Sequence, residues 1–552
     1  MRMAGDLNDG TGRQGEESMG ERMKGGQAAI RALENQGVEV VFGIPGVHTL
    51  EIYDALVDSS IKHILARHEQ GAGFMADGYA RASGKPGVAV IITGPGITNV
   101  MTAVGEAYTD SSPLMVLSSN VEQAWAGQML GHLHDLSDQL GVMRAVTKWN
   151  AQATSVAQVP ALVSEAFSKM KSGRARPTHV EVPLDVLSDF GEAEFSPAAS
   201  EHRTAPDAHD IARAVDLLKG AERVVIWCGG GAVSSAAGGA VAALAEQLGA
   251  PIMTSTMGKG SVPDDHPMLV GRLWEPGNPV DDLLKSADVA LVFGSKLGAM
   301  ETEYQRMPLP KALIRVDVDP AEINRNYTPI HAIVADARLA AEALLSALKD
   351  AGVQNTGTSA EEVSKLKSAS LDASWGAAQK PYVDALRDAI PHDGILVSDM
   401  TMMGYVCCTR YPVYEPRTFL FPQGYGTLGF SLPAAIGAKI ARPDATVVPI
   451  VGDGGFQYTM QEVATAVQFK VGLPIVIFND STYTAVKSAQ ADQYDRRFIA
   501  VDLINPDYLK LADAYGIPSV RAMSPDALTE AIGQAAKRDQ PTIIDVPIRF
   551  ES

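Results

Sequence analysis

The chain has 552 residues and a formal net charge of −19, with 46% apolar and 20% charged residues. A chain of this length holds about three domains and can bury large cores without disulfide bonds or structural metal. Because Asp and Glu outnumber Lys and Arg by 65 to 46, nucleic acid and anionic membranes are poor candidate partners. Only three cysteines occur, two of them adjacent (Cys407 and Cys408), which excludes a disulfide framework and favours a reducing compartment.

The chain starts with a polar segment that lacks the apolar run of a signal peptide. No stretch approaches the roughly 20 apolar residues of a membrane span. We therefore expect a cytoplasmic protein without a membrane or nucleic-acid partner, in which residues 1–23 form a flexible tail.

From residue 27 onward, short apolar runs alternate with longer helical patterns. The candidate buried strands are 38–43, 88–93 and 114–118. The candidate helices between them are 69–83 and 99–108. Such alternation is typical of a parallel sheet with helices on both faces. A stretch over 191–210, rich in Ala, Pro, Ser and Glu, predicts a linker after a first domain over 24–190.

Two further units repeat this alternation. Their candidate strands are 224–228, 289–293 and 313–318 in the second unit, and 446–451, 474–478 and 542–546 in the third. A segment over 352–370, rich in Gly, Ser, Thr and charge, predicts a second linker. We expect a central domain over 205–350 and a last domain over 375–552. The chain is thus predicted to be an α/β protein of three doubly wound parallel-sheet domains.

The first and third units share a local plan of strand, tight glycine turn, helix and strand. The turn follows the carboxyl end of the first strand, where ligands of doubly wound sheets bind. Any βαβ unit has this plan, so on its own the repeat is only suggestive.

The strongest chemical signal lies at two neighbouring strand ends of the third unit. Asp453 follows one buried strand, and Asp480 and Thr482 follow the next, so their oxygens are expected at one edge of the sheet. Two carboxylates and the Thr482 carbonyl are ligands that suit Mg²⁺. Gly454 and Gly455 expose backbone N–H groups at a helix start, which suits a diphosphate. Gly-Asp-Gly is also common in turns, but the pairing across two strand ends favours a metal–diphosphate site.

This arrangement resembles the thiamine-diphosphate signature, and the resemblance covers almost the whole chain. The segments that carry it are 42–46, 67–72, 76–81, 93–99, 424–430 and 432–437. The chain is similar to the acetohydroxyacid synthase and 2-oxo acid decarboxylase group. The resemblance implies pyrimidine-binding and diphosphate-binding domains around a central Rossmann-like domain, with thiamine diphosphate and Mg²⁺ as cofactors.

The resemblance also implies roles for individual residues. Glu69 matches the glutamate at N1′ of the aminopyrimidine, where a carboxyl stabilises the imino tautomer whose N4′ removes the thiazolium C2 proton. Without its neighbours, Glu69 would be interpreted as a carboxylate at a helix start. Gly426 matches the carbonyl that accepts from N4′, and Leu428 the apolar wedge under the bent cofactor, although Leu428 is equally compatible with a core leucine. Further implied cofactor contacts are Pro45, Gly96, Asn99, Thr401 and Tyr483.

The metal ligands implied by the resemblance are Asp453, Asp480 and the Thr482 carbonyl. The family usually has Asn at the position of Asp480, and a second carboxylate is expected to strengthen the hold on Mg²⁺ while repelling the diphosphate. In such enzymes different subunits hold the pyrimidine and the diphosphate. The resemblance therefore implies a homodimer or homotetramer in which Glu69 of one protomer faces Asp453 of the other.

Departures from anabolic acetohydroxyacid synthase bear on the reaction. Asn120 replaces its Gln, Leu133-His134-Asp135 replaces its Phe-Gln-Glu, and Leu184 replaces the lysine of its Pro-Lys-Asp. Its arginine-rich flavin segment is replaced at 294–298, which makes FAD doubtful. The triple glycine at 229–231 could admit a nucleotide, but a tight turn without a ligand is favoured.

Several segments resemble 5-guanidino-2-oxopentanoate decarboxylases of the same group, including 45–49 and 132–135. His48 follows a Pro-Gly turn from which it is expected to reach the thiazolium, donate to a developing alkoxide or deliver a proton. A lone loop histidine is more often polar surface. Candidate substrate contacts, for which surface or core roles are equally compatible, are Asn120, His132, His134 and Val486.

The favoured reaction is the non-oxidative decarboxylation of a 2-oxo acid through a C2 ylide and an enamine, with release of an aldehyde. The alternative is an acetolactate synthase-like carboligase, in which the enamine attacks a second carbonyl. The missing lysine and the presence of His48 favour decarboxylation. A non-catalytic binding protein of the same fold is the third hypothesis, and the retained Glu69 and Asp453 argue against it.

Overall fold

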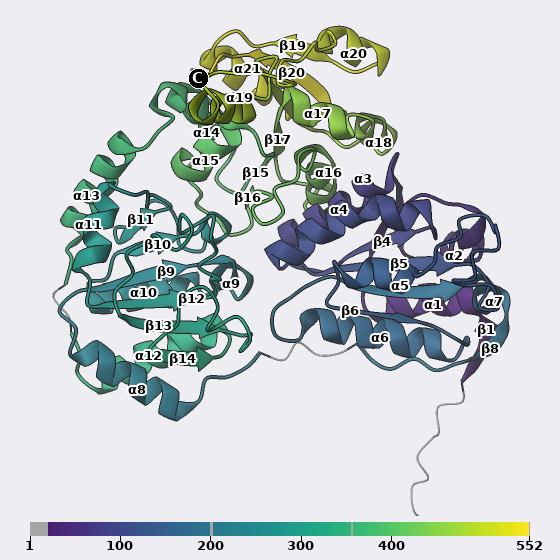
Figure 1. Cartoon of the computed structure of the whole chain (residues 1–552), viewed down its shortest axis with the longest axis horizontal. Coiled ribbons are helices and arrows are strands. Elements are labelled where there is room, and N and C mark those ends of the chain that lie inside the picture. Colours follow the sequence, from purple (N-terminus) through teal and green to yellow (C-terminus); the bar gives the residue numbers. More distant parts are fainter. Residues whose placement is uncertain (1–19, 199–202, 355–356, 551–552) are drawn as a thin grey trace, which may run out of the picture.

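The computed structural model describes residues 20–198, 203–354 and 357–550. They form three six-stranded sheets and one two-stranded sheet, covered by helices. Figure 1 shows the units as three lobes, with the central unit beside the first and the third above both. Among the residues described, no helix is long and apolar enough to cross a membrane. The predicted α/β class with three parallel sheets is confirmed.

The first sheet has the strand order β3-β2-β4-β5-β7-β6, and all its pairs are parallel. Its strands are β2 (Val40–Gly43), β3 (Lys62–Leu65), β4 (Gly87–Ile91), β5 (Leu114–Asn120), β6 (Trp149–Gln152) and β7 (Thr178–Pro183). Its helices are α1 (Gly25–Asn35), α2 (Leu50–Val57), α3 (Glu69–Ser83), α4 (Pro95–Asp110), α5 (Gln139–Arg144), α6 (Gln158–Lys171) and α7 (Leu184–Ser188). One face packs on α1, α2 and α6, and the other on α3 and α4. Burial on both faces explains why its central strands are continuously apolar.

The third sheet has the order β16-β15-β17-β18-β20-β19. Its strands are β15 (Ile395–Ser398), β16 (Phe419–Leu420), β17 (Val447–Gly452), β18 (Pro474–Asn479), β19 (Ser519–Arg521) and β20 (Thr542–Pro547). Its helices are α14 (Lys380–Ala389), α15 (Met402–Arg410), α16 (Ser431–Ala441), α17 (Asp453–Thr459), α18 (Glu462–Gln468), α19 (Thr484–Gln493), α20 (Tyr508–Ala514) and α21 (Pro525–Ala535). Numbered along the chain within each unit, the order is 2-1-3-4-6-5 in both the first and the third sheet. The repeat that the sequence suggested is therefore present.

The central sheet has the order β11-β10-β9-β12-β13-β14, which is 3-2-1-4-5-6 along the chain. This is the order of dinucleotide-binding doubly wound sheets. Its strands are β9 (Val224–Cys228), β10 (Ile252–Thr254), β11 (Leu269–Gly271), β12 (Val289–Phe293), β13 (Ala312–Asp317) and β14 (His331–Val334). Its helices are α8 (Ala208–Lys219), α9 (Gly230–Ser234), α10 (Gly238–Leu248), α11 (Pro279–Ser286), α12 (Ala337–Asp350) and α13 (Ala360–Ala373). A Cβ on Gly229 would lie 2.3 Å from the Gly294 carbonyl oxygen, so close packing explains this glycine of the turn.

The structure differs from the predicted linkers and tail at three places. Strand β1 (Glu21–Lys24) pairs antiparallel with β8 (Phe190–Ala193), so the tail prediction is wrong for residues 21–23 and the linker prediction for residues 191–193. Residues 1–19 of the predicted tail lie outside the described residues. Helix α13 occupies much of the second predicted linker, and its Val363 is buried in the central core. These elements bury few side chains, so their composition is that of a loop.

The first and third units share one apolar core, in which α3 and α4 pack with α16. Phe74 of α3 meets Phe430 edge-on, with ring centroids 5.6 Å apart. Gly78 of α3 and Gly437 of α16 lie at the helix crossing, since a Cβ on either would come within 2.0 Å of a backbone oxygen of the other helix. Glycine at both positions lets the helix backbones touch, which fixes the glutamate at the start of α3 relative to the third unit.

Candidate active site

Asp453 lies at the edge of the third sheet where β17 ends and α17 begins, and it is buried. Its Oδ1 accepts from the backbone N–H of Gly454 at 2.9 Å. Its Oδ2 accepts from the Ser481 backbone N–H at 2.8 Å and from Asn505 Nδ2 at 2.6 Å. Ser481 belongs to the turn after β18, so the two strand ends meet at Asp453 as the sequence predicts. The sequence did not predict Asn505, because it belongs to a loop 52 residues further along the chain.

Asp480 lies beside Asp453 in the turn after β18. Its side chain accepts from the Thr484 hydroxyl and from the Thr482 backbone N–H at 3.3 Å. Burial raises the pKa of both aspartates, and the charge of Asp453 raises the pKa of Asp480 further. Two carboxylates that are costly to ionise side by side fit a site for a divalent cation. The described residues contain no group of three or more His, Cys, Asp or Glu side chains that could hold a metal, so the remaining ligands would come from carbonyl, water and phosphate oxygens.

The loop from 424 to 430 carries the two residues expected to hold the pyrimidine end of the cofactor. Gly426 has φ of +71°, a left-handed conformation that favours glycine. Leu428 is half-buried and lies outside the apolar cores, so it is not an ordinary core leucine. The Thr401 hydroxyl lies against Gly452, at the end of β17, where a Cβ would be 2.9 Å away. Tyr483 packs against Gly454 in the same way. The third-unit candidates thus gather at one edge of the sheet.

Glu69 is the first residue of α3, and His68 caps this helix through Nδ1, which accepts from the Gln70 N–H at 3.1 Å. Asn99 Nδ2, from α4, donates to Glu69 Oε2 at 2.9 Å. A Cβ on Gly96 would lie 3.6 Å from Glu69 Cγ, so the turn before α4 also lies against this side chain. The structure therefore brings three predicted cofactor contacts of the first unit together. Pro45 lies exposed in the loop after β2.

His48 is buried and its ring stacks on His134 with centroids 5.1 Å apart. Among the described residues, neither Nδ1 atom has a hydrogen-bond partner. Burial, with a smaller contribution from His134, lowers the pKa of His48. The neutral imidazole is therefore the favoured form near pH 7, with one N–H to donate and one nitrogen to accept.

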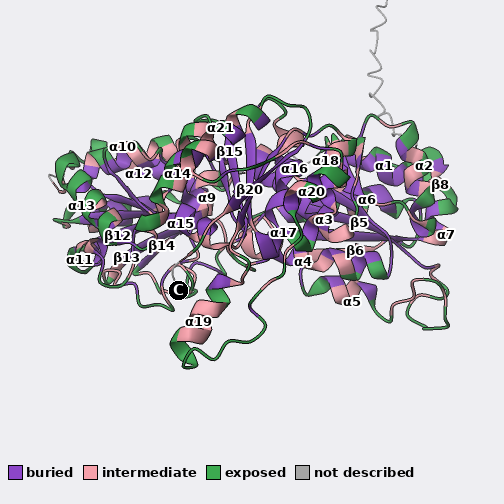
Figure 2. Ribbon diagram, turned by 90° about the horizontal axis from the view of Figure 1, so that it is seen from above, coloured by how far each residue is buried: buried purple, intermediate pink, exposed green. Residues whose placement is uncertain are grey.

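The other predicted substrate contacts have neighbours of their own. His132 stacks on Trp125 with ring centroids 4.3 Å apart. Asn120 is buried and donates to Glu181 at 3.0 Å, within a polar network of the first unit. Val486 is 53% exposed on α19, which projects from the body of the molecule in Figure 2. Among the described residues, no hydrogen bond or ring contact joins these three side chains.

Two buried carboxylates that the sequence did not point to hold backbone next to the predicted site. Glu462, which starts α18, accepts from the backbone N–H groups of Arg67 and His68 at 3.0–3.1 Å, directly before Glu69. Glu106 of α4 accepts from the loop that carries Gly426. Their partners lie more than 300 residues away along the chain, so no local pattern could reveal them.

Two cavities lie at junctions between the units. The larger, of about 690 Å³, lies where the three units meet, and the Gly230–Gly231 turn and Lys296 line it. The Lys296 ammonium donates to the Thr109 carbonyl, which ties the central unit to the first. The glycine turn therefore both packs tightly and borders an open volume.

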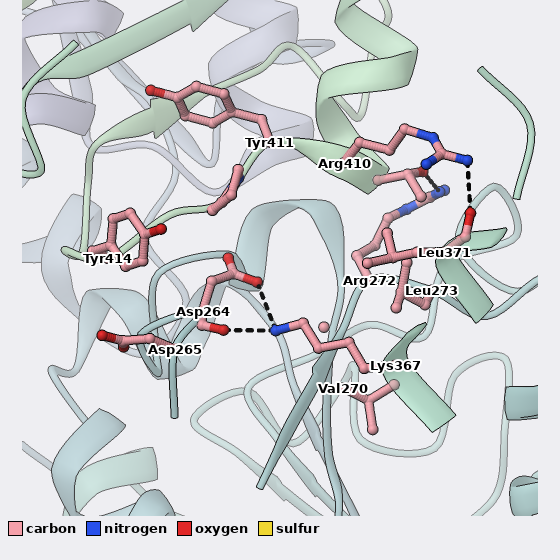
Figure 3. A pocket seen from close by; sticks show the side chains of 13 residues that line it. Asp264, Asp265, Val270, Arg272, Leu273, Lys367, Leu371, Arg410, Tyr411 and Tyr414 are labelled. Carbon is pink, nitrogen blue, oxygen red and sulfur yellow. Dashed lines mark hydrogen bonds and ion pairs between the residues drawn. The ribbon is translucent and has the colours of Figure 1, made fainter. Parts of the chain in front are cut away.

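The smaller cavity, of about 240 Å³, lies between the central and third units (Figure 3). Figure 3 shows Lys367 pointing at Asp264, with an Nζ–Oδ1 distance of 3.6 Å, and Arg410 reaching the Leu371 carbonyl at 2.7 Å. Both cations already have partners within the chain. We therefore interpret this cavity as part of the packing between the central and third units and not as a ligand site.

Comparison with known proteins identifies the class. Residues 23–142, 211–344 and 399–546 match the models of the N-terminal TPP binding, central and C-terminal TPP binding domains of thiamine pyrophosphate enzymes. The chain therefore belongs to the thiamine pyrophosphate enzyme family. Thiamine pyrophosphate is the thiamine diphosphate that the sequence motifs predicted, and this prediction is confirmed.

Similar proteins of known name indicate which members of the family the chain resembles. The chain is 41% identical to the probable 2-ketoarginine decarboxylase AruI of Pseudomonas aeruginosa, over 89% of this chain and 88% of that protein. It is 35% identical to a probable acetolactate synthase large subunit of Methanocaldococcus jannaschii, over 95% and 92% of the two chains. It is 31% identical to the acetolactate synthase isozyme 3 large subunit of Escherichia coli, over 94% and 93%. The predicted group, which includes both activities, is confirmed.

Proposed function

We propose that this chain catalyses the non-oxidative decarboxylation of a 2-oxo acid to an aldehyde, using thiamine diphosphate and Mg²⁺. The observation that carries the proposal is the hydrogen bond from Asn99 to Glu69 Oε2. It orients the carboxyl at a helix start, and no hydrogen bond among the described residues reaches Glu69 Oε1. That oxygen is available to hold a proton at N1′ of the aminopyrimidine.

The third unit supplies the anchor. Asp453, Asp480 and the Thr482 carbonyl would hold Mg²⁺, and the pKa values that burial raises in both carboxyls fit a site completed by a cation. Gly426 and Leu428 would contact the pyrimidine end, since the half-buried Leu428 is free of the core. When bound, thiamine diphosphate supplies a nucleophilic carbon and an electron sink for the departing carboxylate.

His48 is assigned to proton delivery. Its neutral imidazole donates to negative charge that develops on the substrate oxygen and passes a proton from water to the product carbon. The balance is one 2-oxo carboxylate plus one proton giving one aldehyde plus CO₂. No net oxidation occurs, so the proposed reaction does not require FAD.

The substrate side chain is proposed to be cationic. Asp135 follows His134, and its Oδ1 is buried without a hydrogen-bond partner among the described residues. A buried carboxylate oxygen without a donor is costly unless a ligand satisfies it. A guanidinium group, such as that of the 2-ketoarginine named for the Pseudomonas aeruginosa relative, would do so. The test is whether Asp135→Asn loses activity on this acid but not on an uncharged 2-oxo acid.

We further propose that the working form is a homodimer or homotetramer. The support is the motif resemblance to enzymes in which different subunits hold the pyrimidine and the diphosphate, so that Glu69 of one chain would face Asp453 of another. The compartment is proposed to be the cytoplasm, because Cys228, Cys407 and Cys408 are all buried and unpaired.

The test is incubation of purified protein with thiamine diphosphate, Mg²⁺ and a panel of 2-oxo acids, with products identified by NMR. Aldehyde and CO₂ are expected. Acetolactate or an acyloin as the main product would instead establish the carboligase alternative, which the acetolactate synthase relatives support. Cofactor binding without CO₂ release from any acid would favour a binding protein.

Glu69→Gln is expected to lower kcat roughly 100-fold or more, because an amide cannot exchange a proton at N1′. The thermal midpoint should not change, since the neutral amide still accepts from Asn99. Glu165→Gln is the matched control, because among the described residues Glu165 makes only a surface ion pair, with Lys169 at 3.7 Å. An unchanged kcat in Glu69→Gln would refute the assigned role.

A further inference from the structure

The loop from 424 to 430, between β16 and α16, has no regular secondary structure, and it is held from the first unit of the same chain. Glu106 Oε2 accepts from the Thr427 backbone N–H at 3.2 Å and from the Thr427 hydroxyl at 3.0 Å. Glu106 Oε1 accepts from the Tyr425 N–H at 3.3 Å. Both carboxyl oxygens therefore bind the residues on either side of Gly426.

A second carboxylate holds the other end of this loop. Asp399 Oδ2 accepts from the Gly429 N–H at 2.8 Å, and the Gly429 carbonyl accepts from the Thr459 hydroxyl at 2.8 Å. Leu428 lies between the two anchored points and is half-buried. The loop is therefore held on both sides of Leu428, whose side chain lies outside the apolar core.

Glu106 has no exposed surface, so burying its carboxyl group costs free energy unless hydrogen bonds compensate. Burial, with the adjacent Asp110, raises the pKa of Glu106 to about 8. Arg81 compensates mainly Asp77 and Asp110, to which it is bonded at 2.8–3.0 Å. The three hydrogen bonds that the loop donates to Glu106 offset the cost of burying its carboxyl oxygens.

We propose that Glu106 is a positioning residue for the cofactor. It fixes the loop from 424 to 430 so that the Gly426 carbonyl and the Leu428 side chain meet the aminopyrimidine. The inference rests on the proposed function, because it takes these two residues as cofactor contacts. Glu106 lies two turns after Asn99 on α4, so one helix holds both the loop and the residue that orients Glu69. In the proposed dimer, the loop and Glu69 of one chain serve two different sites.

The first test measures the Kd of thiamine diphosphate by isothermal titration calorimetry of the full chain in Mg²⁺. Glu106→Ala removes all three acceptor contacts and should raise Kd about tenfold to a hundredfold. Glu106→Gln keeps one acceptor oxygen, so its Kd should lie between those of Glu106→Ala and the unchanged chain. The control is Glu322→Gln, which breaks a buried ion pair with Arg176 at 2.9 Å between the first and central units and should leave Kd unchanged.

A second pair of variants covers the case in which Glu106→Ala does not fold. Thr427→Val removes one of the three hydrogen bonds and should raise Kd several-fold, about the effect of one hydrogen bond. Thr427→Ser keeps the hydroxyl and should restore the Kd of the unchanged chain. Equal Kd values for Thr427→Val and Thr427→Ser would contradict the inference.

The third readout separates positioning from a general structural role. The near-ultraviolet circular dichroism of the bound cofactor reports how its aminopyrimidine is held. It should change in Glu106→Gln, and kcat should fall more than the KM of the 2-oxo acid changes. An unchanged Kd together with an unchanged dichroism signal would overturn the inference while leaving the proposed function intact. If the unchanged chain binds cofactor but decarboxylates nothing, the proposed function fails, and a Kd shift in these variants still supports Glu106 as a positioning residue.

Discussion

Glu181 of β7 is the residue whose burial has the clearest consequence for stability. It is 1% exposed and accepts from Asn120 Nδ2 at 3.0 Å and Gln139 Nε2 at 2.8 Å. Burial raises its pKa from 4.5 to about 7 against the lowering effect of these hydrogen bonds. Well below pH 4.5 the carboxyl is protonated in both the folded and the unfolded state, so its burial does not change stability with pH. As pH rises from about 4.5 to 7, only the unfolded chain loses the proton readily, so the folded state loses stability on the order of 3 kcal/mol.

Glu181→Gln should remove this loss. We expect the free energy of unfolding of the unchanged chain to fall from pH 5 to pH 8 relative to that of Glu181→Gln, measured by urea denaturation without cofactor. Comparing the two profiles cancels the other buried carboxyls, such as Asp399 and Glu462, which are present in both proteins. Parallel profiles would show that Glu181 keeps an ordinary pKa in the folded chain.

At the scale of residues, the sequence predicted the groups that sit directly at strand and helix ends. Asp453 and Asp480 were predictable because parallel strands end at one edge, and Glu69 because a family motif surrounds it. Glu106 and Glu462 were not predictable, because each binds backbone 319–321 or 394–395 residues away. Burial of a carboxylate against distant backbone N–H groups leaves no pattern in its own neighbourhood.

At the scale of elements, the contact between α3 and α16 holds the first and third units together. A Cβ on Gly78 would lie 2.0 Å from the Ala434 carbonyl oxygen, and one on Gly437 1.9 Å from the Met75 carbonyl oxygen. Gly78→Ala is expected to destabilise the chain by about 2 kcal/mol or more, because backbone oxygens cannot move aside as side-chain ends do. Thermal unfolding followed by circular dichroism would measure the loss.

The matched control is Gly533→Ala in α21, where a Cβ would meet nothing within 4 Å. This substitution should stabilise the chain by about 0.5–1 kcal/mol, since alanine loses less backbone entropy than glycine in a helix. Equal effects of Gly78→Ala and Gly533→Ala would mean that the two helices separate without cost.

Most long elements were predictable because their burial patterns are strong. Helix α3 has the predicted bounds, and β9 and β12 match the predicted runs 224–228 and 289–293. The errors fall on β1, β8 and α13, whose few buried positions, such as Met23 and Val363, are set by partners far along the chain. Periodicity can reveal an element only when the element itself carries a full apolar face.

At the scale of the whole molecule, Figure 1 shows the first and third units side by side through α3 and α16, with the central unit attached to both. The first and third sheets have the same strand order, so their ligand-binding edges are equivalent. The contacts of Glu69 and those of Asp453 involve different residues within one chain. In the homodimer or homotetramer proposed above, each chain would contribute one half to each site.

Complementation between inactive variants tests this assembly. Glu69→Gln and Asp453→Asn should each be inactive alone, because every site lacks one group. In a 1:1 mixture made by co-expression, half of the dimers contain one chain of each kind, and one of their two sites combines an intact Glu69 with an intact Asp453. About a quarter of all sites should then be active, and purification through two different tags should raise this to about half. If each site were built within one chain, every site would still lack one group, and no activity would return in the mixture.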